Sequence, residues 1–246
     1  MKKFFALLLL LAIGWGVYYT MQAQEHDEPF SSSSGGEDES GSNDIYRNFK
    51  ELEENESTSS YQITANPVPG SRLLVMSPHG GRIEGGVSEI VHFFDNDFST
   101  YLFEGLRENA SELHITSTNF DEPIGVAQAK AHDYVLAVHG YRGEEGIDHT
   151  LVGGTDYDRA EKIVNSLERN GFSAELAVAH ASLSGTSNHN INNLTKTGQS
   201  VQLEISRSQR EALFDSFDFR RRSSTKNEAF YRYVRAIRTV LDEEYT

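Results

Sequence analysis

The pattern of apolar and polar positions divides most of the chain into alternating short strands and helices. Apolar runs and period-two alternation predict strands over 61–65, 73–76, 101–106, 113–118, 134–143, 149–154, 172–179 and 201–206. Apolar residues at helical spacing predict helices over 45–55, 87–94, 126–132, 156–171 and 227–245. Such alternation is typical of an α/β fold, and we expect a single domain over residues 45–246 with a mixed, mostly parallel sheet flanked by helices.

The first 44 residues do not share this pattern. Residues 1–21 begin with two lysines after the first Met and continue into an apolar run, which is typical of a signal peptide or an N-terminal membrane anchor. The apolar stretch 4–19 is 16 residues long, shorter than the ~20 that span a bilayer comfortably. Either interpretation predicts export, with the protein secreted or anchored on the outer face of the cell membrane. Residues 22–44 are rich in Ser, Gly and acidic residues and predict a disordered spacer.

Composition narrows the classes of function. The chain contains no cysteine, which excludes thiol catalysis, cysteine-ligated zinc and disulfide bonds. Its formal net charge is −15 and no long basic stripe appears, so we do not expect nucleic-acid binding. The region after the spacer is long enough to bury a sizeable core by itself, and we expect a monomer.

Two histidines and a glutamate follow predicted strands and lie beside glycines. The stretch MSPHGGRIEGG, residues 76–86, carries His79 and Glu84 among four glycines. Each glycine costs ~1 kcal/mol in a helix interior relative to Ala, so this is not a helical zinc motif. His139 follows the apolar run 134–138 in the same manner. Two histidines and a carboxylate at strand ends are a usual ligand set for catalytic zinc, although each histidine alone is also consistent with a hydrogen-bonding core residue.

Glu204 lies inside the otherwise apolar strand predicted over 201–206. Burial of a carboxylate there is costly unless the group is paired or functional. One interpretation is a general base that takes a proton from water at the metal. The other is an ion pair with Arg142, Arg207 or Arg210, and the pattern leaves both open. The remaining histidines of the domain are expected to pack or to lie at the surface, namely His92, His114, His132 and His149, with His189 in a loop and His180 near Ser182 and Ser184.

Four stretches together carry a family resemblance: SPHGGRIEGGVSEI, VHGYRG, LVGG and VQLEIS. They resemble the poly-γ-glutamate hydrolases of bacteriophages and bacilli, whose fold is similar to that of the zinc carboxypeptidases. The resemblance runs from about Ile45 to the C-terminus. It implies one zinc ion per chain held by His79, Glu84 and His139, with Glu204 as the general base. It also implies cleavage of γ-glutamyl amide bonds in anionic poly-γ-glutamate.

One departure from the family pattern concerns the substrate. Where the family carries an arginine after its asparagines, this chain has Leu194. We expect Asn190 and Asn193 to orient the substrate, and Arg142 or Lys196 to supply the missing charge. Two other functions stay open: a related zinc peptidase or amidase acting on cell-wall peptides or N-acyl amino acids, and a catalytically silent binding module of the same fold.

Overall fold

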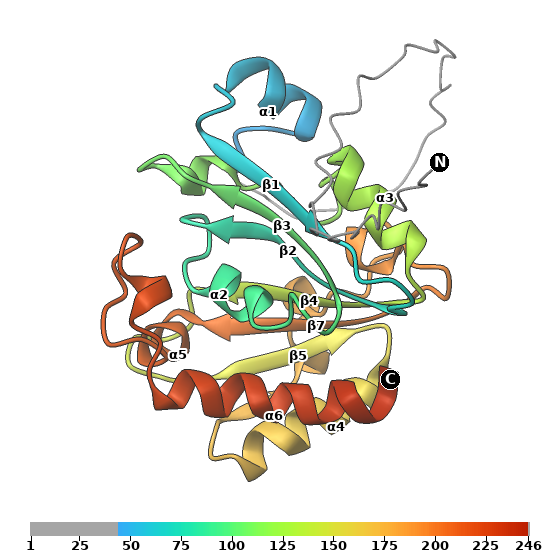
Figure 1. Ribbon diagram of the computed structural model, residues 1–246, viewed down its shortest axis with the longest axis vertical. Coiled ribbons are helices and arrows are strands. Elements are labelled where there is room, and N and C mark those ends of the chain that lie inside the picture. Colours follow the sequence, from blue (N-terminus) through green and yellow to red (C-terminus); the bar gives the residue numbers. More distant parts are fainter. Residues whose placement is uncertain (1–43, 246) are drawn as a thin grey trace, which may run out of the picture. The chain divides into compact units, whose positions relative to one another are not determined.

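A seven-stranded sheet organises residues 44–245, the part of the chain that the computed structural model describes (Figure 1). The strands lie in the order β1-β3-β2-β4-β7-β5-β6. Their bounds are β1 Tyr61–Asn66, β2 Leu73–Gly81, β3 Ser99–Gly105, β4 Tyr134–Tyr141, β5 Thr150–Gly154, β6 Ala174–Leu176 and β7 Gln199–Ser206. Strands β3, β2, β4 and β7 are parallel neighbours, whereas β1 and β5 pair antiparallel with β3 and β7. The predicted mixed, mostly parallel sheet is confirmed.

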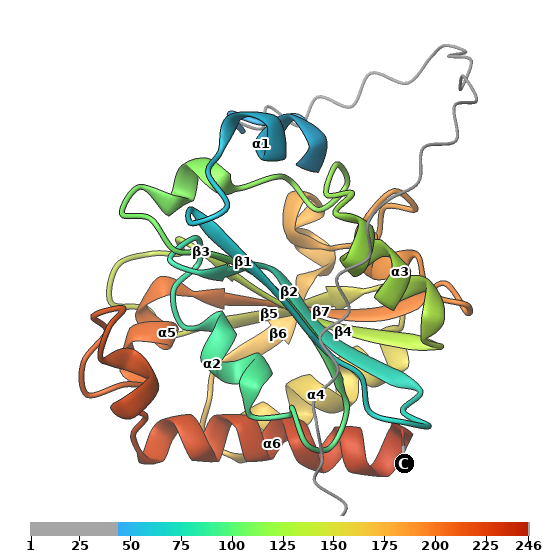
Figure 2. The same cartoon turned by 45° about the horizontal axis from the view of Figure 1, so that its top comes forward.

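Helices cover both faces of this sheet. They are α1 Phe49–Asn55, α2 Val87–His92, α3 Pro123–Ala131, α4 Tyr157–Arg169, α5 Arg207–Ala212 and α6 Glu228–Tyr245. Figure 2 shows α2, α4 and α6 on one side of the sheet and α1 and α3 on the other. Local sequence sets several of the helix ends. The Asp156 side chain, for example, accepts a hydrogen bond from the backbone N–H of Arg159 at the start of α4.

Successive side chains of the buried strands point to opposite faces of the sheet and pack in two separate apolar cores. On β2, Leu73 and Val75 belong to the core under α2, α4 and α6, whereas Leu74 and Met76 belong to the core under α1 and α3. Both faces of β2 are therefore buried, which explains why its sequence is a continuous apolar run instead of an alternating one.

Several observed elements differ from the predicted ones. The strand predicted over 113–118 is wrong: a 3-10 turn, η1 Ala110–Leu113, is followed by irregular chain. The predicted alternation of buried and polar side chains is present, because Leu113 and Ile115 are both fully buried. The segment nevertheless pairs with no strand of the sheet. The strand predicted over 172–179 shrinks to β6, and α5 was not predicted at all. Strand β2 also continues through His79 to Gly81, beyond its predicted end at Met76.

The predicted leader over 1–21 and all but the last residue of the predicted spacer over 22–44 lie outside the described residues. Among the helices of residues 44–245, none is both long enough and apolar enough to cross a membrane.

Candidate metal centre

The glycines around His79 build a tight turn that returns the chain to the histidine. The register between β2 and β3 shifts between Ser77 and Gly80, so the strand is irregular at its carboxyl end. Gly81 has φ +70°, and a Cβ there would lie 2.4 Å from the carbonyl oxygen of Gly105. The Glu84 backbone N–H then donates to the His79 carbonyl at 3.0 Å. These contacts hold Glu84 beside His79, so the glycines serve close packing.

Three predicted ligands converge at the carboxyl ends of β2 and β4. His79 Nδ1 lies 2.9 Å from Glu84 Oε1 and 3.0 Å from His139 Nδ1. His139 Nδ1 lies 3.8 Å from Glu84 Oε2. Zinc bonds of 2.0–2.1 Å at a tetrahedral angle would separate two ligand atoms by roughly 3.3 Å. The three separations scatter around that value, with Glu84 facing His79 through Oε1 and His139 through Oε2, so the donor types and their spacing suit a zinc ion.

Hydrogen bonds to the far sides of these groups fix their orientation. His79 Nε2 donates to the carbonyl of Ile115 at 2.9 Å, so its Nδ1 faces Glu84 and His139. The backbone N–H of Gly140 donates to Glu84 Oε2 at 2.7 Å. His139 Nε2, in contrast, is buried and has no hydrogen-bond partner among the described residues. Partners of this kind hold metal ligands in the binding tautomer and orientation.

A fourth group, His114, was not predicted for this site. Ligand atoms of His79, Glu84 and His114 lie within 4.8 Å of one another, with His114 Nε2 at 3.9 Å from Glu84 Oε1. His114 Nδ1 is bonded to Asp44 Oδ1 at 2.6 Å, so its Nε2 side faces the centre. His114 lies between the apolar residues Leu113 and Ile115, and this pattern indicated only that its side chain points away from the core. No sequence signal placed Asp44, the last residue of the predicted spacer, against it.

Burial and mutual charge shift the pKa values of these groups. Burial would lower the pKa of His79, but the Glu84 carboxylate and the Ile115 carbonyl outweigh it and raise that pKa. Burial would raise the pKa of Glu84, and the neighbouring histidines instead lower it to about 2. Burial, reinforced by the charge on His79, lowers the pKa of His139 to about 3. His139 therefore stays neutral, as a metal ligand must be.

Glu204 enters the same region from β7, where it is the register partner of His139. It is buried, and Gln202 Nε2 donates to its Oε1 at 2.9 Å. Within the described part of the chain Glu204 makes no ion pair, so the interpretation as a partner of Arg142, Arg207 or Arg210 is wrong. Burial and the nearby negative charge of Glu84 raise its pKa well above the usual range, against a smaller lowering by Arg210.

The three predicted substrate-binding residues lie outside the cluster formed by His79, Glu84 and His139. Arg142 is exposed just after β4. Asn190 accepts from the Asn192 N–H and donates to Gln202 Oε1. Asn193 donates to the carbonyls of Gly185 and Ser187 and accepts from two hydroxyls, including that of Ser200. Ser200 precedes Glu204 by four strand residues, or roughly 13 Å. These side chains stabilise the loop before β7, and direct substrate contact stays a prediction.

The charge expected in place of the family arginine does not come from the loop around Leu194. Leu194 packs against the apolar core under α1 and α3. Lys196 pairs with Asp133, which directly precedes β4, whereas His139 lies near the other end of that strand. Lys196 therefore lies at the amino end of the sheet, opposite the candidate metal centre.

The chain is similar to known proteins in both sequence and fold. The family model described as poly-gamma-glutamate hydrolase matches residues 46–236. The chain is 57% identical over 231 residues to the UPF0714 protein YmaC of Bacillus subtilis (strain 168), covering 94% of this chain and 92% of that protein. It superposes on a solved structure named YNDL-apo (Zinc-free) with a TM-score of 0.79 and 42% identity, covering 82% of this chain and 100% of the other. A structure of a bacteriophage poly-gamma-glutamate hydrolase gives a TM-score of 0.75 and 34% identity, covering 81% and 97%.

Proposed function

The chain belongs to the poly-gamma-glutamate hydrolase family, and we propose that it is a zinc-dependent amidohydrolase that cleaves γ-glutamyl amide bonds of poly-γ-glutamate. The observation that carries the proposal is the convergence of His79 Nδ1, His139 Nδ1 and the Glu84 carboxylate beside the buried carboxylate of Glu204. The choice of zinc as the metal is supported by the similar YNDL structure, which is named as a zinc-free form.

The donor set assigns separate tasks to these residues. His79, Glu84 and His139 would hold the zinc ion, with His114 next to them. When bound, zinc supplies a Lewis acid that polarises the amide carbonyl and lowers the pKa of water toward ~7. A catalytic site needs one coordination position open for water or substrate, and three protein ligands leave one in a tetrahedral arrangement.

Glu204 would move the proton. Its Oε1 accepts a hydrogen bond from Gln202, which fixes the carboxylate on β7. The carboxylate accepts one proton from the attacking water and then gives it to the amine that leaves when the C–N bond breaks. Burial and the charge of Glu84 raise the pKa of this carboxylate, and the positive charge of a bound zinc ion would lower it again, so that the group would accept a proton and then release it.

The direct test is hydrolysis of purified poly-γ-glutamate by the zinc-loaded protein, begun at or before residue 44 so that Asp44 is retained. We expect shorter fragments with new amino termini, and no reaction after chelation. An α-linked poly-glutamate of equal length and a muropeptide serve as comparison substrates. Cleavage of the muropeptide with no cleavage of poly-γ-glutamate would favour a cell-wall amidase, and cleavage of neither by a zinc-loaded sample would favour a binding module.

We also propose that the protein is exported, on the strength of the basic and apolar residues 1–21 alone. A cleaved signal predicts a mature protein that begins near Gln24 in the culture medium. A retained anchor predicts the full-length chain in the membrane fraction, and recovery of all the protein in the cytosol would contradict both. We expect the exported protein to be a monomer, which its elution volume in size-exclusion chromatography tests.

A further inference from the structure

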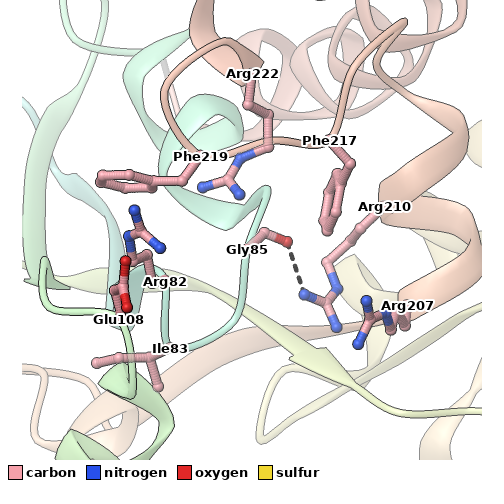
Figure 3. Close-up of a pocket in the computed structure, with 9 residues that line it drawn as sticks. All are labelled: Arg82, Ile83, Gly85, Glu108, Arg207, Arg210, Phe217, Phe219 and Arg222. Atoms are coloured by element: carbon pink, nitrogen blue, oxygen red, sulfur yellow. Dashed lines mark hydrogen bonds between the residues drawn. The ribbon is translucent and has the colours of Figure 1, made fainter.

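Four arginines line a pocket (Figure 3). Its lining includes Ile83 and Gly85, the residues before and after Glu84 in the sequence. Its volume is about 310 Å³. Arg82 comes from the turn after β2, Arg207 and Arg210 from α5, and Arg222 from the turn before α6. Phe217 and Phe219 belong to the same wall. We call this the arginine pocket. Its residues are distributed along the sequence, so no local motif reveals it.

The arginine pocket shares a wall with the candidate metal centre. Arg210 Nη1 donates to the carbonyl of Gly85, the residue after Glu84, at 2.7 Å. On the other side, a Cβ at Gly140 would lie 2.4 Å from Arg210 Cζ, and Gly140 directly follows His139. The guanidinium of Arg210 is therefore packed against the backbone next to two of the predicted zinc ligands.

Two of the four arginines keep their charge unpaired. Arg207 pairs with Glu211 at 2.7 Å and Arg222 with Glu89 at 3.0 Å. Arg82 and Arg210 make no ion pair within residues 44–245, and the single acidic side chain in the lining is Glu108.

Both arginines without an ion pair also have N–H groups that make no hydrogen bond within the described residues. Three N–H groups of Arg210 donate to backbone carbonyls, and a guanidinium carries five. Arg82 Nε is buried without a hydrogen-bond partner among the described residues, while its Cζ lies 4.4 Å from the centre of the Phe219 ring. The site therefore offers fixed, planar donors to an anion.

The chemistry favours a carboxylate as that anion. Guanidinium groups bind carboxylates in two-point geometry, and a local positive pocket on a chain of formal net charge −15 selects anionic groups from solution. A γ-linked glutamate chain leaves an α-carboxylate on every unit, next to every scissile amide. We propose that the arginine pocket binds the α-carboxylate of the glutamyl unit beside the bond to be cut, and so selects γ-linked polymer. The inference rests on the proposed function.

The test uses two γ-linked oligoglutamates of equal length, one with free α-carboxylates and one with every α-carboxylate converted to a carboxamide. Loss of a charged hydrogen bond costs roughly tenfold to a hundredfold in affinity. The wild-type protein should therefore favour the free acid by about that factor in kcat/KM. Arg82→Gln should reduce the preference, chiefly by raising KM for the free acid, because one of the two unpaired arginines is lost. Arg82→Lys, which keeps the charge but not the planar fork, should recover part of it.

The matched control is Arg169→Gln. Arg169 is an exposed arginine of α4 without an ion pair in the described part of the chain, and its replacement makes the same charge change. It should leave both substrates unchanged, and melting temperatures show whether each variant is folded. An equal loss on both substrates in Arg82→Gln, or a preference for the free acid as large as that of the wild-type protein, would overturn the pocket while the hydrolase function stands.

A failure of the proposed function gives a different result. If zinc-loaded wild type cleaves neither oligomer, calorimetric binding of the uncleaved free acid tests the pocket alone. Weaker binding in Arg82→Gln but not in Arg169→Gln supports the pocket. Equal binding in all three proteins, or binding in none, overturns it.

Discussion

His139 and Glu204 are register partners on the parallel strands β4 and β7, so both side chains leave the sheet on the same face. The preceding apolar residues of β4 on that face, Val135 and Ala137, pack in the core under α1 and α3. Residue 139 is the point where this face changes from apolar core to polar site. The pairing places the proposed proton acceptor beside a proposed metal ligand, and both side chains come from strands instead of loops.

This pairing predicts that Glu204→Gln separates catalysis from metal binding. Glutamine keeps the shape and removes the proton acceptor, so zinc content should be unchanged while turnover falls about 10²–10⁴-fold. Zinc content, melting temperature and turnover are measured on one sample. Glu84→Gln is the matched variant, because it makes the same chemical change at a ligand and should weaken zinc retention itself. Turnover near the wild-type value in folded Glu204→Gln would remove Glu204 from the mechanism.

The ligand assignment predicts a graded loss of zinc. The wild-type protein should carry about one zinc per chain, and His79→Ala or His139→Ala should lose it because two remaining protein ligands hold zinc weakly. His114→Ala should keep the metal with affinity lowered about 10–100-fold, as for groups that support a ligand set. Zinc retained in His139→Ala but lost in His114→Ala would replace His139 by His114 in the set. Full occupancy in a His79→Ala/His139→Ala double variant would refute the assignment.

The strands that carry the histidines were predictable because burial on both faces leaves apolar runs in β2 and β4, whereas β7 was predictable from its alternating polar and apolar residues. The run of β4 ends at His139, and the run of β2 ends three residues before His79. Glu204 was noticed for another reason, as a carboxylate inside a strand. Residues outside these runs gave no such signal. His114 depends on contact with Asp44, 70 positions away, and the arginine pocket joins residues 82 and 222. Contacts of that range follow from the packed tertiary structure, which local periodicity does not encode.

Gln202 is predicted to position Glu204. It donates to Glu204 Oε1 and accepts from the side chains of Asn190 and Asn192 at 3.3 and 2.7 Å. Gln202→Met keeps the volume but removes these bonds, so the Asn192 amide loses a buried partner. We expect a lower melting temperature and a lower kcat with KM nearly unchanged. Gln202→Glu puts a second carboxylate next to the Glu204 carboxylate and replaces the hydrogen bond by repulsion. This variant therefore also tests whether Glu204 depends on residue 202 for its position. Wild-type kcat in folded Gln202→Met would show that the bond is structural only.

Asp44 should matter to the site although it belongs to the predicted spacer. Its Oδ1 holds His114 Nδ1 at 2.6 Å, and its Oδ2 accepts from the backbone N–H and the hydroxyl of Thr116 at 2.6 and 2.7 Å. Asp44→Ala should cost about 1–3 kcal/mol of unfolding free energy, because a backbone donor loses its partner. It should also lower zinc affinity or turnover about 10–100-fold by freeing the His114 ring.

The matched control for Asp44→Ala is Asp121→Ala. Asp121 Oδ1 accepts from the backbone N–H of Phe49 at 2.7 Å, so its removal also deletes a carboxylate-to-backbone bond near the start of the domain. It does not touch His114, and we expect reduced stability with normal zinc affinity and turnover. Denaturant unfolding, zinc titration and turnover are compared for both variants. If Asp44→Ala matches Asp121→Ala in all three measurements, the orientation of His114 has no part in function.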